Sequence, residues 1–119
     1  MLADESDASM LLLEAMLRDD ARFEVVAAVS TGAQLVAESD HADLVVMDLV
    51  LADTDAFSAI RLLRERDPAL PVIVYASVDP PYLRAEAEAH GAAGFFRRGA
   101  DPQAVLDGFA NVARLTRAD

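Results

Sequence analysis

The chain has 119 residues, 54% of them hydrophobic and only five each glycine and proline, which predicts one compact domain over residues 1–119 with a sizeable core. Its 21 acidic and 10 basic residues give a net charge of −11, which argues against direct binding to nucleic acid or to an anionic membrane surface. Because the chain has no cysteine, no apolar run of membrane-spanning length and no basic signal-peptide start, we expect a soluble cytoplasmic protein without disulfides or thiol chemistry.

Short apolar runs alternate with helical patterns in the first part of the chain. The pattern predicts, in order, a strand over 1–3, a helix over 6–20, a strand over 23–29 and a helix that ends near residue 41. Ser30 or Thr31 is the expected N-cap of the second helix. The acidic pair Asp4 and Glu5 directly follows the first strand.

The clearest strand signal is the apolar run over 44–47, which Asp48 follows directly. Four uninterrupted apolar residues, two of them β-branched, are typical of a strand that is buried on both faces. Parallel sheets bind ligands beyond the carboxyl ends of their strands, so Asp48 lies where a functional site is expected. A loop over 49–55 follows, and Asp55 is the expected cap of the next helix.

The same alternation continues to the end of the chain. It predicts a strand over 71–76, a helix over 82–90, a strand over 94–97 and a last helix over 102–115 that Asp101 caps. Strands joined by helices require parallel pairing with right-handed crossovers. We therefore predict an α/β fold, a flavodoxin-like doubly wound five-stranded parallel sheet in the order 2-1-3-4-5 with helices on both faces.

Three carboxylates converge at the switch point of this sheet, between the first and third strands. Asp4 and Glu5 follow the first strand, and Asp48 follows the third. Clustered carboxylates repel one another unless a cation neutralises them, and oxygen ligands without His or Cys select Mg²⁺. We therefore expect a magnesium site here. In the alternative reading, Asp4 and Glu5 only complement the dipole of the first helix.

The same residues resemble a known family. The acidic pair after the first strand, the stretch over 48–57 and the segment over 91–95 resemble the receiver domain of two-component response regulators. The similarity runs through essentially all of the chain. Only three residues precede Asp4, fewer than in the family, so we expect that the sequence lacks its natural start.

The resemblance implies a role for each acidic residue. Asp48 would accept a phosphoryl group from the phosphohistidine of a histidine kinase or a phosphotransfer protein. Asp4 and Glu5 would hold Mg²⁺ directly or through water, with Asp48 and the backbone carbonyl of Val50 completing the coordination.

Two positions expected at the phosphoryl group depart from the family pattern, as do Ala52 and Ala56, which stand where Pro and Gly are usual. Ala76 stands where the family has a Thr or Ser that bonds the phosphoryl oxygens, and its methyl group cannot donate a hydrogen bond. Ser77 is the candidate substitute, although neighbouring strand residues point to opposite faces. Arg98 stands at the family's Lys position, where a planar guanidinium is not an equivalent replacement, unless it only belongs to a charged turn. Phe95 matches the switch aromatic of the family, with plain packing as the alternative.

The expected function is that of a phosphoacceptor signalling domain, which at most catalyses its own aspartyl phosphorylation and is not a metabolic enzyme. The acidic residues after the first strand would repel the phosphate of a flavin or nucleotide, and no Gly-x-Ser-x-Gly motif of a hydrolase occurs. The remaining alternative is a pseudo-receiver, a protein-interaction module that has lost the phosphorylation switch. Ala76 favours this alternative, whereas Asp48 and the acidic pair favour phosphorylation.

The resemblance also implies a partner-binding surface on the helix over 82–90, the strand over 94–97 and the last helix. Its polar residues are Tyr82, Arg84, Glu86, Arg97, Asp107 and Asn111. This mixture suits a moderate, polar interface with a second copy of the chain or with another protein, and the alternative is a solvated face. In a symmetric homodimer, a basic Arg84 or Arg97 would meet an acidic Glu86 or Asp107 of the other copy.

Overall fold

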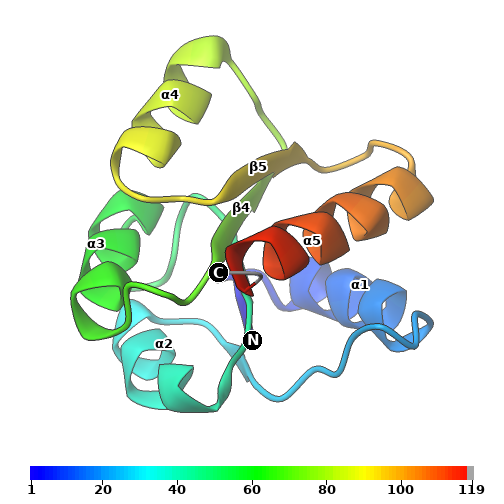
Figure 1. Cartoon of the computed structure of the whole chain (residues 1–119), viewed down its shortest axis with the longest axis horizontal. Coiled ribbons are helices and arrows are strands. Elements are labelled where there is room, and N and C mark those ends of the chain that lie inside the picture. Colours follow the sequence, from blue (N-terminus) through cyan, green and yellow to red (C-terminus); the bar gives the residue numbers. More distant parts are fainter. Residues whose placement is uncertain (118–119) are drawn as a thin grey trace.

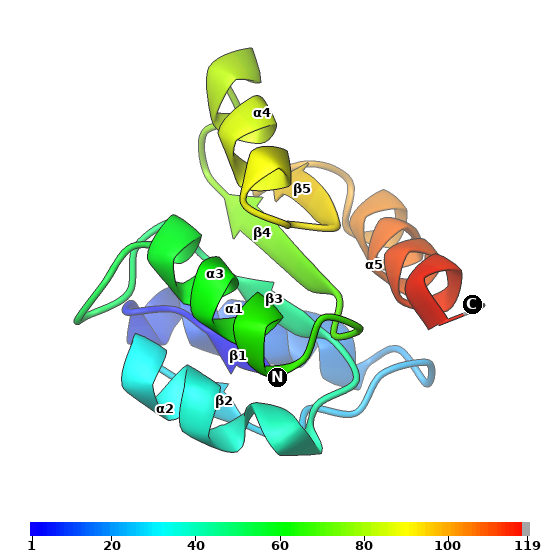
Figure 2. The ribbon, with the colours of Figure 1, turned by 60° about the vertical axis from the view of Figure 1, so that its left-hand side comes forward.

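A computed structural model describes residues 1–117 of the chain. In these residues, five strands form one parallel sheet in the order β2-β1-β3-β4-β5, which confirms the predicted flavodoxin-like order; strands β4 and β5 are labelled in Figure 1 and all five in Figure 2. The strands are β1 (Leu2–Ala3), β2 (Ala28–Val29), β3 (Val45–Met47), β4 (Val72–Ala76) and β5 (Gly94–Arg97).

Helices connect successive strands and cover both faces of the sheet. They are α1 (Asp7–Arg18), α2 (Gly32–Glu38) with the 3-10 turn η1 (Ser39–His41), α3 (Ala56–Arg66), α4 (Pro81–Ala89) and α5 (Pro102–Arg117). Helices α1 and α5 lie on one face, and α2, α3 and α4 lie on the other (Figures 1 and 2). None of the helices in the described residues is long and apolar enough to cross a bilayer.

Side chains alternate along the strands and so supply two core layers. Val46, Ile73 and Tyr75 point toward α1 and α5, where Phe109 is fully buried among them. On the other face, strand residues such as Val74 pack with the apolar residues of α2 and α3. The sheet is therefore apolar on both faces, and its polar groups gather at the strand ends.

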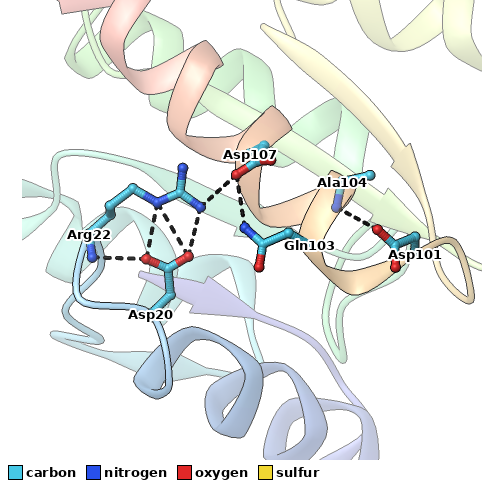
Figure 3. Close-up of polar contacts among 6 residues, drawn as sticks. All are labelled: Asp20, Arg22, Asp101, Gln103, Ala104 and Asp107. Atoms are coloured by element: carbon cyan, nitrogen blue, oxygen red, sulfur yellow. Dashed lines mark hydrogen bonds and ion pairs between the residues drawn. The ribbon is translucent and has the colours of Figure 1, made fainter.

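Side-chain caps determine where most of the helices begin. Thr31 accepts a hydrogen bond from Gln34 N at the start of α2, and Asp55 accepts one from Ser58 N at the start of α3. Asp101 caps α5 in the same way by accepting from Ala104 N at 3.1 Å (Figure 3). These three caps agree with the sequence-based predictions.

Strand β2 is much shorter than the predicted strand over 23–29. It pairs only with β1, in the register Leu2↔Ala28 and Ala3↔Val29. Because β1 itself has two residues, the preceding segment has no backbone partner to pair with. Phe23 and Val25 instead pack beside the core layer under α1 and α5.

A polar link ties the connection between α1 and β2 to helix α5 (Figure 3). The Arg22 guanidinium contacts Asp20 at 2.7 Å and Asp107 at 2.9 Å. Gln103 also donates to Asp107, at 3.0 Å. Asp107 is therefore engaged on the side of α5 that faces the α1 connection, away from α4.

Candidate functional site

Parallel pairing brings Asp4 and Asp48 to the same edge of the sheet. Strands β1 and β3 are neighbours with Ala3 opposite Met47, so the next residue of each strand is an aspartate. The Asp48 N–H donates to the Ala3 carbonyl at 3.0 Å, which fixes the two strand ends against each other. The predicted convergence of Asp4 and Asp48 therefore follows from the register.

The Asp4 carboxylate is buried and bound on both oxygens. Its Oδ1 accepts from the Ser6 N–H at 2.9 Å, and its Oδ2 accepts from Arg98 Nη2 at 2.9 Å. A buried carboxylate needs such partners, because losing its hydration is otherwise costly. The counter-charge comes from a residue 94 positions further along the chain.

Arg98 is held in place by three contacts. Besides its ion pair with Asp4, its guanidinium carbon lies 4.5 Å from the centroid of the Tyr75 ring, a cation–π arrangement. Its backbone N–H donates to the Ala76 carbonyl at 2.8 Å. The guanidinium thus lies at the carboxyl ends of the strands and on the side of the sheet that Tyr75 faces.

Asp48 is partly buried and lies within the electric field of this ion pair. Burial raises the pKa of Asp48 above its ordinary value; the hydrogen bond from the Leu49 N–H (2.8 Å) lowers the pKa, and the negative charge of Asp4 raises it. The positive charge of Arg98 lowers the pKa of Asp48, and the negative charge of Glu5 raises it. The carboxylate is therefore more basic than an exposed aspartate.

The remaining predicted metal ligands are less constrained. Glu5 is exposed at the start of the loop before α1, and Val50 is half exposed and pairs with Asp55 in a short antiparallel bridge. The oxygen-only donors of this region fit a hard cation such as Mg²⁺. Within residues 1–117, however, no three His, Cys, Asp or Glu side chains form a group arranged to hold a metal ion. The donor chemistry fits magnesium, while one oxygen of Asp4 already faces Arg98.

The last residue of β4 is an alanine, which offers the site no hydroxyl. Ala76 is 1% exposed and belongs to the core layer that contains Phe95. Ser77 is exposed just beyond the strand. Phe95 is buried, and the Arg84 guanidinium lies 5.2 Å from its ring centroid.

The loop after Asp48 is anchored to helix α2. Asp53 accepts from the Gly32 N–H at 2.6 Å and from the Ala33 N–H at 3.2 Å, and the Gly32 bond lowers the pKa of Asp53. The Ala52 N–H also donates to the Ser30 carbonyl at 2.9 Å. The loop that contains Val50 is thus attached to the layer on the α2 side.

The predicted partner surface is partly used by contacts within the chain. Tyr82 is 69% exposed, and Glu86 and Arg97 are also exposed. Arg84 instead contacts Asp79 at 3.3 Å and covers Phe95, and the Asp107 carboxylate pairs with Arg22. Glu86 Oε2 lies 3.8 Å from His90 Nδ1, an ion pair when His90 is protonated, so Arg97 is the charge of this surface that is best placed for an intermolecular contact.

Sequence reasoning missed Tyr75 and Asp53. Tyr75 is an aromatic residue at the end of an otherwise aliphatic strand, and two-residue alternation places it on the same face as Arg98, which was an available signal. Asp53 lies in an acidic loop, and nothing local in the sequence links it to the start of α2.

Known proteins share both the sequence pattern and the fold. A family model described as the response regulator receiver domain matches residues 1–109. The signal receiver domain of NarL from Mycobacterium tuberculosis is 18% identical, with a TM-score of 0.85 over 95% of this chain and 93% of that one. CheY4 of Vibrio cholerae is 20% identical, with a TM-score of 0.82 over 93% and 94%. CheY in the CheX-CheY-BeF3-Mg complex of Borrelia burgdorferi is 19% identical, with a TM-score of 0.85 over 93% and 85%.

A further relative is much longer than this chain. A protein-glutamate methylesterase/protein-glutamine glutaminase 2 of Methanospirillum hungatei is 26% identical over an alignment of 81 residues, which covers 66% of this chain. The matched region spans only 23% of that protein's length. The enzyme activity in its name therefore says nothing about this chain.

Proposed function

This chain belongs to the family of response regulator receiver domains, and we propose that it accepts a phosphoryl group on Asp48 from the phosphohistidine of a histidine kinase or phosphotransfer protein. The observation that carries the proposal is the position of Asp48: a partly buried carboxylate at the end of the central strand β3, beside a buried acid and a fixed cation. We propose that this phosphoryl transfer takes place in the cytoplasm.

The proposed transfer uses Asp48 as the nucleophile. One carboxylate oxygen forms a bond to phosphorus while the phosphorus–nitrogen bond of the donor breaks. The electron pair of that bond stays on the imidazole nitrogen, and the ring leaves as neutral imidazole because its other nitrogen already carries a proton. Burial keeps the carboxylate basic, which favours attack. Arg98, whose charge already acts on Asp48, would stabilise the negative charge that the phosphoryl group brings.

We propose that Mg²⁺ supports this reaction. Asp48, Asp4 and Glu5, with the carbonyl of Val50, are the oxygen donors that would hold it. When bound, the metal offsets the repulsion between the entering phosphoryl group and the carboxylates. This proposal has the support of the oxygen-only donor chemistry and of the family.

Intact-mass spectrometry after incubation with acetyl phosphate and Mg²⁺ tests the proposed function. We expect the wild type to gain the mass of one phosphoryl group and the Asp48→Asn variant to gain none. The Asp67→Asn variant, which changes an exposed aspartate after α3, should be labelled like the wild type. Labelling that persists in the Asp48→Asn variant would remove Asp48 as the acceptor.

A pseudo-receiver is the second candidate, and Ala76 is the observation that favours it. Phosphorylation adds roughly −1.5 to −2 charges, and a structure responds only where groups engage the phosphoryl oxygens differently in two states. The methyl group of Ala76 is buried and cannot engage them. In this reading, the domain acts through protein contacts that do not depend on phosphorylation.

The Ala76→Thr variant separates a weakly coupled receiver from a fully switching one. We expect beryllofluoride to shift the amide resonances of β5, α4 and α5 only weakly in the wild type. A threonine hydroxyl at position 76 should enlarge those shifts, because it adds a donor for the phosphoryl oxygens. Valine has nearly the shape of threonine but no hydroxyl, so the Ala76→Val variant should behave like the wild type. A complete two-state rearrangement in the wild type would contradict this account.

A further inference from the structure

Arg98 and Asp4 form the most enclosed ion pair in the described residues. The Asp4 side chain is 1% exposed and the Arg98 side chain 19%, whereas every other ion pair has a partner that is at least 34% exposed. Both Asp4 oxygens are bound, one by the Ser6 N–H and one by the guanidinium. The arginine therefore supplies the positive charge that a buried carboxylate requires.

The arginine is positioned by its surroundings as well as by Asp4. Its guanidinium stacks on Tyr75 at 4.5 Å, and its backbone is tied to the Ala76 carbonyl at 2.8 Å. A planar guanidinium can stack and donate at the same time, which the compact ammonium of lysine does less well. The cation is thus part of the folded structure.

We infer that Arg98 is a built-in competitor of the divalent cation: it lowers the affinity of the acidic site for Mg²⁺ and leaves Asp4 when the metal binds. This inference rests on the proposed function for the identity of the metal. Mg²⁺ demands near-octahedral coordination by oxygen, and Asp4 Oδ2 now points at a cation. Two cations that share one carboxylate repel each other, so metal binding carries the cost of breaking the ion pair.

Magnesium titrations without any phosphodonor test the competition. Amide chemical shifts of β1, β3 and the following loops give the dissociation constant for the wild type and for Arg98→Gln, Arg98→Lys and Arg97→Gln. We expect Arg98→Gln to bind Mg²⁺ on the order of tenfold more tightly than the wild type, the scale of one charged hydrogen bond. Arg98→Lys keeps the charge and should stay closer to the wild type than Arg98→Gln.

Arg97→Gln is the matched control for net charge. Arg97 is the exposed neighbour of Arg98, and its loss changes the total charge by the same amount. Its magnesium affinity should equal that of the wild type. In an Asp4→Asn background, Arg98→Gln should no longer tighten binding, because the contested carboxylate is gone.

Tyr75 reports directly on whether Arg98 moves. The chain has two tyrosines and no tryptophan, so in a Tyr82→Phe background the intrinsic fluorescence comes from Tyr75 alone. Saturating Mg²⁺ should change this emission when Arg98 is present and leave it unchanged in Arg98→Gln. The readout requires neither phosphorylation nor activity.

A stability measurement covers the case in which the variant folds poorly. Arg98→Gln leaves Asp4 without its counter-charge, so the melting temperature of this variant without metal should fall below that of the wild type. Mg²⁺ should raise the melting temperature of Arg98→Gln by more than it raises that of the wild type. The inference would be overturned if the wild type and Arg98→Gln bound Mg²⁺ with equal affinity, or if no variant bound it. It would also be overturned if the Tyr75 emission of the protein with Arg98 did not change on Mg²⁺ binding. The mass gain at Asp48 tests the proposed function separately.

Discussion

At the scale of single residues, the pKa values of Asp48 and of Asp53, in the loop that follows it, shift in opposite directions. Burial raises the pKa of Asp48, whereas the hydrogen bond from the Gly32 N–H lowers the pKa of Asp53. The folded protein therefore holds a proton on Asp48 more tightly than the unfolded chain does, and it holds one on Asp53 less tightly. These opposite effects predict opposite dependences of stability on pH.

The Asp48→Asn variant should be more stable than the wild type at neutral pH. Between the ordinary value of 3.8 and the raised pKa of folded Asp48, the wild type loses stability as the pH rises, and the neutral amide removes this loss. The difference should disappear when the pH falls below the ordinary value. Urea unfolding across this range measures it. For Asp53→Asn the sign reverses: that variant should be less stable at neutral pH and approach the wild type in acid. An Asp48→Asn variant that is the less stable protein at neutral pH would contradict this reading.

Asp4, Asp48 and Arg98 were proposed for the site from the sequence, but Tyr75 and the contacts among these side chains were missed. The strand ends predict that Asp4 and Asp48 lie at one edge, because parallel strands end together, whereas Arg98 was a candidate only through the family resemblance. Which acid Arg98 binds depends on side-chain packing around Tyr75, and no local pattern encodes that. The roles proposed for these residues stay predictions.

At the scale of elements, β5 and α5 meet through an aromatic cluster that requires glycine. The ring of Phe96 packs edge-on against Phe109, with centroids 5.2 Å apart. A Cβ added at Gly108 of α5 would overlap the Phe96 ring. On its other side, the same ring lies near Gly94, where a Cβ would be 3.1 Å from it. The Phe96 ring therefore has little space in which to move away from a Cβ at position 108.

The Gly108→Ala variant should therefore lose stability although alanine favours helices. Replacing a helical glycine gains up to about 1 kcal/mol, while overpacking typically costs about 1–3 kcal/mol, so we expect a net loss of about 1 kcal/mol. Chemical unfolding measures it. Adding Phe96→Leu removes the overlap, so Gly108→Ala should stabilise the Phe96→Leu protein. A Gly108→Ala single variant that is more stable than the wild type would show that the ring relaxes.

Helix starts were predictable from the sequence, whereas one strand was not. Thr31 and Asp55 cap their helices through bonds only three residues away, which local sequence encodes. The length of β2 depends instead on β1, a segment more than twenty positions away along the chain. The apolar character of the segment over 23–26 reflects packing of Phe23 and Val25 beside the core, without strand pairing.

At the scale of the whole molecule, the strand order follows from general rules. Five strand–helix units with right-handed crossovers leave few arrangements, and the order 2-1-3-4-5 is confirmed. Contacts between distant surface residues are not restricted in this way. Arg22 joins Asp107 of α5 to the α1 connection, so the acidic charge that we expected to meet a second copy is used within the chain (Figure 3).

The α4–β5–α5 face nevertheless keeps features of a partner surface. Tyr82 is largely exposed, and Glu86 and Arg97 are exposed charges of opposite sign. We propose that this face binds a second copy of the chain, with Arg97 of each copy near Glu86 of the other. Two chains of net charge −11 repel at long range, but at physiological salt the Debye length of about 8 Å screens that repulsion more than it weakens pairs in contact.

Sedimentation of the wild type and of Arg97→Glu tests this arrangement. We expect a dimer of the wild type that weakens as salt rises above the physiological range, because the remaining contacts are polar and partly exposed. Arg97→Glu places two acids face to face and should be monomeric throughout. Arg18→Glu makes the same change in net charge on α1 and should dimerise like the wild type. Restoring a basic partner by Glu86→Arg in the Arg97→Glu background should recover the dimer, since the swapped pair has the same geometry. A wild type that stays monomeric at every salt concentration, with and without phosphodonor, would contradict the homodimer, and the remaining proposal would be that this face binds a different protein.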